Sequence, residues 1–314
     1  MIDVQSPVLF LVFNRPDTTA RVFEAIREAR PPRLYLAADG PRLNREGEAT
    51  LSAETRRIAS AVDWDCEVKT LFRDENKGCK LAVSEAITWF FDHEERGIIL
   101  EDDCLPVPDF FRFCDEMLER YQHDPRVMLV SGDNFVSQAP SLQFDGSYYF
   151  SVFGHIWGWA TWRRAWKGYD VKMSLWNASH GQRLLKKVFP DNGPMRRIWR
   201  ETFSNVAAGK VNTWDYQWTH HCWVNGGLSC VPEVNLISNI GFDERATHTT
   251  DAESRLAGLP VGALTWPLTH PRDILQHQAA DRWESAHFFD LHRYTLRRVL
   301  GRRLKVMLGL RDTA

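Results

Sequence analysis

Short apolar runs alternate with amphipathic segments over roughly the first 130 residues, and this alternation restricts the possible folds more than any other feature of the sequence. The first run, Val8 to Phe13, is closed by Asn14-Arg15-Pro16. Asp17 then begins a segment in which Val22 and Ile26 share one helical face. Repeats of an apolar run, a polar turn and a helical period are typical of βαβ units. The sequence therefore predicts an α/β protein with a mostly parallel sheet flanked by helices.

The same pattern predicts individual elements. Strands are predicted at residues 8–13, 34–38, 67–72, 98–100 and 127–130. Helices are predicted at residues 17–29, 52–62, 78–92 and from Pro106 or Pro108 to about Tyr121. After about residue 150 the alternation weakens, and aromatic residues, among them most of the 13 Trp, become frequent. We expect a Rossmann-like α/β half followed by a helical, Trp-rich half.

Length and the lack of a linker predict how these halves are organised. A chain of 314 residues suits one large domain or two small ones, and no Gly-, Pro- or Ser-rich tract divides it. We expect an α/β half at residues 1–135, a second half at residues 136–275 packed on the same sheet, and a basic amphipathic tail at residues 276–314. The tail suits either docking on an anionic membrane surface or packing on its own domain.

Composition excludes several classes of protein. Lys and Arg total 39 against 41 Asp and Glu, a formal net charge of −2, so the average surface does not attract nucleic acid. Hydrophobic residues at 44% and charged residues at 25% are typical of globular proteins. The apolar run at residues 7–13 is too short for a signal peptide or a membrane span, and no two of the six cysteines form a C-x-x-C pair. We expect a cytoplasmic protein with reduced thiols.

Acidic residues follow three of the predicted strands. They are Asp39, the pair Asp74-Glu75, and the triplet Glu101-Asp102-Asp103. Because open parallel sheets bind ligands beyond the carboxyl ends of their strands, we expect these side chains at one binding edge. Clustered carboxylates favour a bound Mg²⁺ or Mn²⁺, which prefers oxygen ligands. For Asp39 or Asp74 alone, a role in a turn or a helix cap is an equal alternative.

The acidic triplet also carries a resemblance to a known family. It is followed by Cys104-Leu105-Pro106 and preceded by Asn76-Lys77-Gly78, which opens a predicted helix. This combination resembles the DXD-type motif of nucleotide-sugar-dependent glycosyltransferases of GT-A fold. The resemblance runs from residue 7 to about residue 250 and is closest to bacterial proteins related to family 2 and to N-acetylglucosaminyltransferase I, whose motif is also Glu-Asp-Asp. It implies a GT-A-type sheet, a nucleotide-sugar donor, most simply a UDP-sugar, and a Mn²⁺ or Mg²⁺ cofactor.

The resemblance implies roles for the triplet and for other donor-side residues. Asp103 would bind the metal, and Asp102 would hydrogen-bond the ribose or the donor sugar. Glu101 would contact neither the metal nor the donor and would orient the residues that do. The other implied donor-side residues are Asn14, Arg15, Asp39, Asp74, Asn76 and Lys80. Among them, Asp39 and Asp74 resemble the acidic residues that read uracil.

The helix after Gly78 is expected to face phosphate, because backbone N–H groups at a helix N-terminus attract anions and Lys80 adds a positive charge. Family 2 members often have Ala-Arg-Asn in this helix, where the chain has Ala82-Val83-Ser84. The basic residue of the donor side is therefore left open.

On the acceptor side, Asp215 lies between aromatic residues. A partly desolvated carboxylate that stays ionised makes an effective base, and the resemblance implies that Asp215 deprotonates the acceptor hydroxyl with Trp214 and Trp218 beside the acceptor. A helix N-cap at Asp215 is a compatible alternative. Trp157 and Trp159, among glycines, suit a wall between donor and acceptor, with a Trp-rich core as the alternative.

A late histidine, His248, lies where many metal-dependent enzymes of this fold take a further ligand, although a structural role is the alternative. Together these residues predict inverting transfer of a sugar to a carbohydrate or lipid-linked acceptor in surface polysaccharide or glycoconjugate synthesis. A sugar-nucleotide nucleotidyltransferase is a second possibility, although residues 14–17 lack its glycine-rich loop. A non-catalytic carbohydrate-binding protein on the same fold is a third. The basic tail predicts peripheral contact with the inner membrane face.

Overall fold

The computed structural model describes residues 4–137, 139, 141–242 and 259–289. Its strands are β1 (Val8–Val12), β2 (Arg33–Ala38), β3 (Glu67–Phe72), β4 (Arg96–Glu101), β5 (Cys104–Pro106), β6 (Val127–Ser131), β7 (Tyr148–Ser151), β8 (Trp159–Trp162), β9 (Leu228–Pro232) and β10 (Ile237–Asn239). Its helices are α1 (Pro16–Ala29), α2 (Glu48–Ala59), α3 (Cys79–His93), α4 (Pro108–Arg120), α5 (Arg163–Trp166), α6 (Ala178–Val188), α7 (Gly193–Ala207), α8 (Asp215–Val224) and α9 (Gln278–Phe288).

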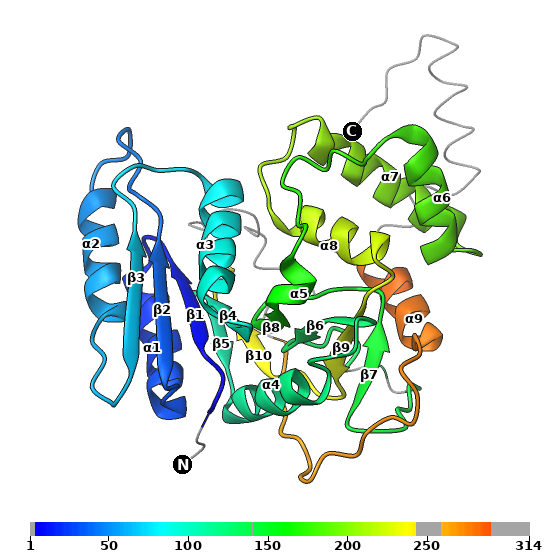
Figure 1. The fold of residues 1–314 in the computed structure, drawn as a ribbon, viewed down its shortest axis with the longest axis horizontal. Helices are drawn as coiled ribbons and strands as arrows, with labels where there is room; N and C mark the ends of the chain where they lie inside the picture. The colour runs from blue at the N-terminus through cyan, green and yellow to red at the C-terminus, as the bar shows by residue number, and fades with distance from the viewer. Residues whose placement is uncertain (1–3, 138, 140, 243–258, 290–314) are drawn as a thin grey trace.

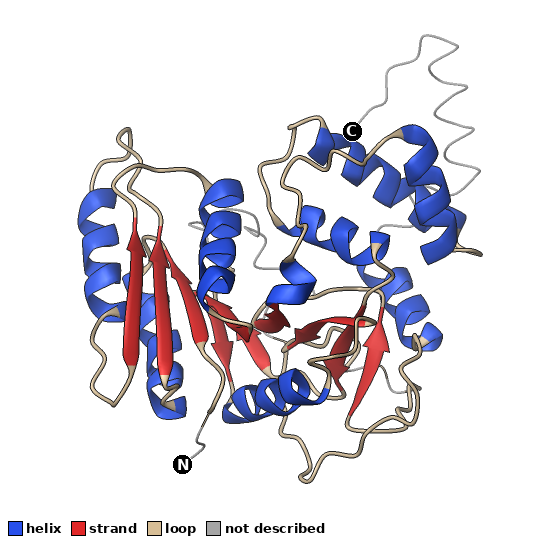
Figure 2. Cartoon of the chain, in the orientation of Figure 1, coloured by secondary structure: helices blue, strands red, loops and turns tan. Residues whose placement is uncertain are grey.

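A single large sheet organises the molecule (Figures 1 and 2). Eight strands lie in the order β3-β2-β1-β4-β8-β6-β9-β7. Strands β1 to β4 are parallel, and β6 and β9 run in the same direction, because β8 is antiparallel to both β4 and β6 and β9 is parallel to β6. Only β8 and β7 of the eight run the other way. The predicted mixed α/β fold with a mostly parallel sheet and flanking helices is confirmed.

Two groups of helices complete the molecule. Helix α1 packs against α2 and α4, while α3 packs against β1, β2 and α5. Helices α6, α7 and α8 pack on one another around a separate apolar cluster that includes Leu185, Met195 and Phe203. This helical group lies beyond the edge toward which the arrowheads of β1 to β3 point, whereas α9 packs on β7 (Figure 1).

The predicted elements of the first half are present, with small shifts. All five predicted strands occur, but the helix predicted at residues 52–62 already begins at Glu48. Its N-cap is Gly47 in a left-handed conformation, without a side-chain cap, so the sequence carries none of the usual Ser, Thr, Asp or Asn signals at its start. The short strand β5 is not predicted from the sequence, because it ends at Pro106 and proline is typical of a helix start.

The expectation of a helical second half is wrong in part. Residues after 135 contribute β7, β8 and β9 to the main sheet and β10 to a small two-stranded sheet with β5. These strands are three to five residues long, and β7 and β8 are buried at every position. A short strand that is covered on both faces has no polar–apolar alternation, so its sequence does not distinguish it from a buried helix.

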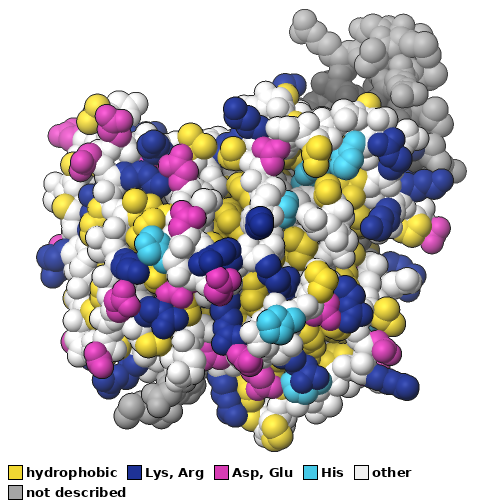
Figure 3. Space-filling model, viewed as in Figure 1, with side chains coloured by type: hydrophobic (Ala, Val, Ile, Leu, Met, Phe, Trp, Pro, Cys, Tyr) yellow, Lys and Arg dark blue, Asp and Glu magenta, His cyan; other side chains and the backbone are white. Residues whose placement is uncertain are grey.

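The surface matches the balanced composition. On the face shown in Figure 3, Lys and Arg side chains are interspersed with Asp and Glu over most of the molecule. No helix in the described part of the chain is long and apolar enough to cross a membrane. The predicted basic tail falls mainly on residues 290–314, which lie outside the described residues.

Candidate functional site

The acidic triplet lies where the strand order changes direction. The chain leaves β1 toward β2 on one side and returns from β3 to β4 on the other side of β1, which makes the β1/β4 boundary the switch point of the sheet. Leu11 is paired with Glu101 in the parallel register, and the Phe13 amide donates to Asp102 Oδ2 at 3.1 Å. Ligands of open α/β sheets bind outside the strand ends at such a point.

The small second sheet fixes the far end of the triplet. Directly after Asp103 the chain forms β5, which pairs with β10, and the Ile240 amide donates to the Asp103 carbonyl at 2.8 Å. Gly241 follows and packs directly on Asp103 and Arg15. A Cβ atom there would overlap the Asp103 carboxylate and lie 2.7 Å from Arg15 Nη1. Only glycine fits this close approach.

Arg15 is the cation that the structure places on Asp103. Its Nη1 lies 3.0 Å from Asp103 Oδ2, and its side chain is only 8% exposed, against 23% for Asp103. The guanidinium therefore reaches the carboxylate from inside the protein and leaves the opposite side partly open to solvent. The structure brings the predicted donor-side residue Arg15 and the predicted metal ligand Asp103 into direct contact.

The triplet carries more negative charge than Arg15 neutralises. Burial, followed by the charges of Asp103, Asp102 and Asp215, raises the pKa of Glu101 well above its usual value. Burial and the charge of Asp103 raise the pKa of Asp102 to about 7, against the opposing effects of Arg15 and the Phe13 amide. Carboxylates perturbed by burial and by one another are typical of functional sites, and a cation relieves their repulsion.

Asp39 holds the loop before α3. Its carboxylate accepts hydrogen bonds from the backbone amides of Gly40, Lys77 and Gly78, at 2.9 to 3.0 Å. Asn76 adds a bond from its side-chain amide to the Gly40 carbonyl at 2.7 Å. Both oxygens of Asp39 are therefore engaged within the protein, and its predicted contact with uracil, which would compete with these bonds, stays a prediction.

The other donor-side residues lie around the same loop and the end of β1. Asp74 is exposed, and its backbone packs against Gly40, while Lys80 is half-buried in the first turn of α3. Asn14 donates from its side-chain amide to Glu48 Oε1 at 3.2 Å. The structure places all of them at the carboxyl edge of the sheet, where they were expected, but it shows no direct contact of Asp74 or Lys80 with the triplet.

The buried Glu48 beside Asn14 was missed from the sequence. It is 4% exposed and accepts bonds from the backbone amide and guanidinium of Arg42, whose hydrogen bond lowers the pKa of Glu48. The Arg42 guanidinium also lies 5.4 Å from the centre of the Phe13 ring. Arg42 lies in a polar loop and Glu48 at the start of a helix without a clear period, so no local sequence pattern predicted their contact.

Asp215 reaches the acidic triplet from the other half of the chain. It is the first residue of α8, follows the N-cap Trp214 and accepts a hydrogen bond from the Thr213 hydroxyl, so it is not itself the N-cap. Its charge contributes to the raised pKa values of Glu101 and Cys79, although burial is the largest cause for both. The structure thus places the charge of Asp215 within reach of Glu101, while the roles of Asp215 as a base and of Asp103 as a metal ligand stay predictions.

Three of the four predicted acceptor-side tryptophans are core residues. Trp159, Trp214 and Trp218 are 0%, 2% and 1% exposed, and their rings pack at 5.7 Å between centroids, both Trp214 and Trp218 lying on Trp159. Their indole faces are covered by protein, so the expectation that they border the acceptor is wrong for these three. For Trp159 the alternative of a Trp-rich core is correct, and Trp214 and Trp218 belong to the same core.

Trp157 alone among the four is half-exposed. Its ring lies 5.1 Å from that of Phe135 and 5.6 Å from that of Phe242, edge-on to both. Phe242 directly follows Gly241, the residue that packs on Asp103. Trp157 is therefore connected through Phe242 and Gly241 to Asp103, and its role as a wall between donor and acceptor stays a prediction.

Only one of the two predicted metal ligands, Asp103, lies among the described residues. His248 lies outside the described residues. Among the residues that the structure describes, no three His, Cys, Asp or Glu side chains are arranged to hold a metal ion. His248 therefore stays a predicted ligand, and Mg²⁺ beside phosphates usually takes further ligands from the substrate and water.

A second polar cluster lies farther along the same edge, after β6. Asp133, His155 and Glu284 are 0%, 6% and 3% exposed and converge from three segments of the chain. No sequence pattern predicts this cluster, because its members are single polar residues more than 20 positions apart. Asp133 lies close enough to Cys104, the neighbour of Asp103, to contribute to the raised pKa of that thiol.

Comparison with known proteins identifies no family. No protein-family model and no curated protein matches the sequence. Among solved structures, HddC from Yersinia pseudotuberculosis is 12% identical, with a TM-score of 0.31 over 51% of this chain and 78% of that chain. Apo UDP-glucose pyrophosphorylase is 9% identical, with a TM-score of 0.34 over 76% of this chain and 93% of that chain. We base no functional assignment on similarities of this size.

Proposed function

We propose that this protein is a glycosyltransferase of GT-A type that moves a sugar from a nucleoside diphosphate, most simply UDP, to an acceptor hydroxyl. The observation that supports this proposal is that Asp215 lies close enough to Glu101, the first residue of the acidic triplet, for its charge to act on that carboxyl group. The charges of Asp215 and of the two aspartates all contribute to the raised pKa of Glu101. A candidate base and an acidic motif, more than 100 residues apart in sequence, thus interact electrostatically, as a shared site would require.

The donor would lie across the ends of β1, β2 and β4. Asp102 would hydrogen-bond the ribose or the donor sugar, and Asn14, Arg15 and Asp74 would line the nucleotide pocket. The loop held by Asp39 and Asn76 presents the N-terminus of α3, where backbone N–H groups and Lys80 would attract phosphate. Glu101, half-buried at the end of β4, would orient its neighbours without touching the donor.

The residues present fit a divalent metal ion. Asp103 is partly open to solvent, and the negative charge around it exceeds what Arg15 neutralises, as the raised pKa values of Glu101 and Asp102 indicate. Asp103 would hold the Mn²⁺ or Mg²⁺, with His248 as a candidate second ligand. When bound, the metal supplies charge neutralisation for the departing diphosphate.

On the acceptor side, Asp215 would accept the proton of the attacking hydroxyl, while Trp157 would border the acceptor. Attack at the anomeric carbon from the face opposite the diphosphate would invert its configuration. The Thr213 hydroxyl, which donates to the Asp215 carboxylate, would hold that side chain in place for proton transfer.

Release of UDP from UDP-sugars in the presence of Mn²⁺, with water as acceptor, tests the proposal. We expect slow UDP release by the wild type and a loss of about 10²-fold to 10⁴-fold for Asp215→Asn, because a positioned base contributes that much. UDP binding by Asp215→Asn should remain. Asp191→Asn removes the same charge at an exposed position before α7 and serves as the matched control.

The other outcomes separate the alternatives. Formation of pyrophosphate from a sugar nucleotide would favour a nucleotidyltransferase. Binding of UDP-sugars without any turnover would favour a non-catalytic carbohydrate-binding protein. Unchanged UDP release by Asp215→Asn would show that the base is assigned to the wrong residue.

A further inference from the structure

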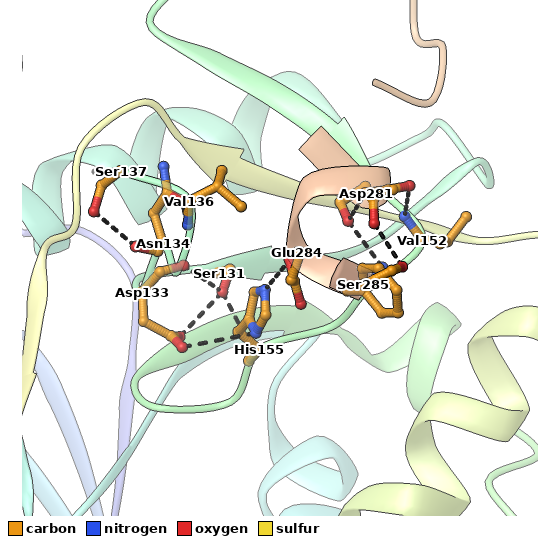
Figure 4. A network of polar contacts seen from close by, with 12 residues as sticks. Ser131, Asp133, Asn134, Val136, Ser137, Val152, His155, Asp281, Glu284 and Ser285 are labelled. Carbon is orange, nitrogen blue, oxygen red and sulfur yellow. Dashed lines mark hydrogen bonds and ion pairs between the residues drawn. The ribbon is translucent and has the colours of Figure 1, made fainter. Parts of the chain in front are cut away.

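The cluster after β6 is a buried charge network (Figure 4). His155 Nε2 lies 3.3 Å from Glu284 Oε2, and its Nδ1 lies 4.0 Å from Asp133 Oδ2. Asp133 Oδ2 has no hydrogen-bond partner, although it is fully buried. A buried ionisable group without a partner is costly, so an imidazolium between these two carboxylates is the arrangement that stabilises all three.

The network fastens the segment 154–158 to the sheet. The Ser131 hydroxyl lies within 3.2 Å of both the Asp133 carboxylate and the His155 carbonyl, and the Gly132 amide donates to the Gly158 carbonyl at 2.8 Å. Gly158 has a φ of +72°, and a Cβ atom there would lie 2.6 Å from Ile237 and 3.1 Å from Leu100. The segment is thus wedged between β10 and the residue that precedes the acidic triplet.

Aromatic contacts extend this connection to Asp103. The Phe135 ring lies 4.1 Å from the His155 ring and 5.1 Å from Trp157, which in turn contacts Phe242. Phe242 follows Gly241, whose backbone packs on Asp103 and Arg15. A continuous series of packed side chains therefore leads from Glu284 on α9 to the acidic site.

We propose that His155 is a positioning residue: clamped between Asp133 and Glu284, it couples helix α9 to the wall formed by Trp157 and Phe242 beside the acidic triplet. The proposal rests on the proposed function only for its effect on turnover, because the placement of Trp157 can be measured without a substrate. A series of packed residues transmits a change only if one residue in it can adopt two states. The charged and neutral forms of His155 are two such states.

The surroundings of His155 determine when that charge is lost. The titratable groups that face it are Asp133 after β6, Glu284 and Asp281 on α9, and Tyr149 of β7, which lies beside the same carboxylates. Burial lowers the pKa of His155, but the charge and hydrogen bond of Glu284 and the charge of Asp133 outweigh it and raise the pKa to about 9. His155 is therefore charged at neutral pH.

A linked titration tests the coupling. The side-chain resonances of His155 and the indole N–H resonance of Trp157 are followed by NMR in the full chain, with His155→Gln and Trp157→Phe to assign them. We expect both to change with one midpoint near pH 9. In Glu284→Gln we expect both midpoints to fall together by about 1–3 units, since an adjacent opposite charge shifts a pKa by that amount.

Asp281→Asn is the matched control. Asp281 anchors the same helix, by bonds from Ser151, Val152 and Gln276, and acts on His155 only through its charge, which shifts the pKa of His155 less than burial, Glu284 or Asp133 does. We expect it to lower the melting temperature while shifting the joint midpoint much less than Glu284→Gln does. If Glu284→Gln does not fold, the wild-type titration alone decides.

Three results would overturn an assignment. A Trp157 resonance that stays constant while His155 titrates would refute the coupling. Equal shifts of Trp157 in Asp281→Asn and Glu284→Gln would attribute the effect to general loosening of α9 and would also refute it. A linked titration in a protein that shows no UDP release would leave the positioning role intact and contradict the proposed function instead.

Discussion

At the scale of single residues, the contact of Gly241 with Asp103 and Arg15 is the tightest constraint at the site. The added methyl group of Gly241→Ala would overlap the Asp103 carboxylate and lie 2.7 Å from Arg15 Nη1, so the pair must separate. We expect a loss of stability of about 1–3 kcal/mol, the usual cost of overpacking, together with weaker Mn²⁺-dependent UDP binding.

Calorimetric titration of UDP with Mn²⁺ and a melting curve measure both effects of this substitution. Gly193→Ala is the control, because a Cβ atom at Gly193 would meet its nearest neighbour at 3.7 Å, an ordinary contact. Full UDP affinity in Gly241→Ala would show that the Arg15–Asp103 pair does not belong to the binding site.

Trp157 and Trp159 are two residues apart and have opposite environments, which makes them a matched pair. Trp159 is fully buried, so Trp159→Ala should reduce the free energy of unfolding by about 3–5 kcal/mol. Trp157 is half-exposed, and Trp157→Ala should reduce it by less while lowering the rate of transfer. Denaturant unfolding and UDP release check both; equal destabilisation would mean that Trp157 is also a core residue.

At the scale of elements, the loop between β3 and α3 depends on one carboxylate. Asp39→Asn replaces an acceptor with a donor opposite the Lys77 and Gly78 amides. We expect a loss of about 1.5–3 kcal/mol, the range for hydrogen bonds to charged groups. Asp74→Asn removes the same charge at an exposed position after the neighbouring strand. It should change the free energy of unfolding by no more than about 0.5 kcal/mol.

Urea unfolding of the two variants measures the difference between Asp39 and Asp74. Similar values for both would show that the bonds of Asp39 contribute little to the loop. UDP binding by the same two proteins also tests whether either residue contacts the nucleotide.

The elements that the sequence predicts well are those with long, regular patterns. Strands β1 to β4 and helices α1, α3 and α4 have apolar runs or helical periods that begin and end at clear turn or cap residues. The predicted strand ends therefore indicate where the acidic triplet lies. Strands β7 to β10 are too short and too evenly buried to show a period. From the sequence alone, the rings of Trp159, Trp214 and Trp218 could lie in the core or on a ligand-binding surface. Only their burial in the structure distinguishes these two environments.

The site residues that the sequence missed are contacts between distant segments. Glu48, Asp133, His155 and Glu284 are single polar residues without a spacing motif, and their roles arise only when the sheet brings their segments together. Asp215 was found because aromatic neighbours marked it, but nothing in the sequence placed it beside Glu101. Tertiary contacts of this kind follow from topology, which local patterns do not specify.

At the scale of the whole molecule, the buried network of His155 makes stability depend on pH. The pKa of His155 is raised from 6.5 in the unfolded chain to about 9 in the folded one. Its contribution is therefore fully present below pH 6.5 and is lost as the pH rises through 9, with a slope of about 1.4 kcal/mol per pH unit between these values.

Urea unfolding of the wild type and of His155→Gln between pH 6 and pH 10 measures this dependence. The difference in unfolding free energy between the two proteins should shrink as the pH increases over that range. A constant difference would show that His155 is not charged in the folded protein.

The central claim is that the acidic triplet at the β1/β4 switch point binds a metal together with a nucleoside diphosphate. Crystals grown with UDP and Mn²⁺ and measured at the manganese absorption edge test it most directly. The claim predicts an anomalous peak within bonding distance of the Asp103 carboxylate and of the diphosphate, and no such peak in crystals of Asp103→Asn. No manganese and no nucleotide at this edge of the sheet in the wild-type crystals would contradict it.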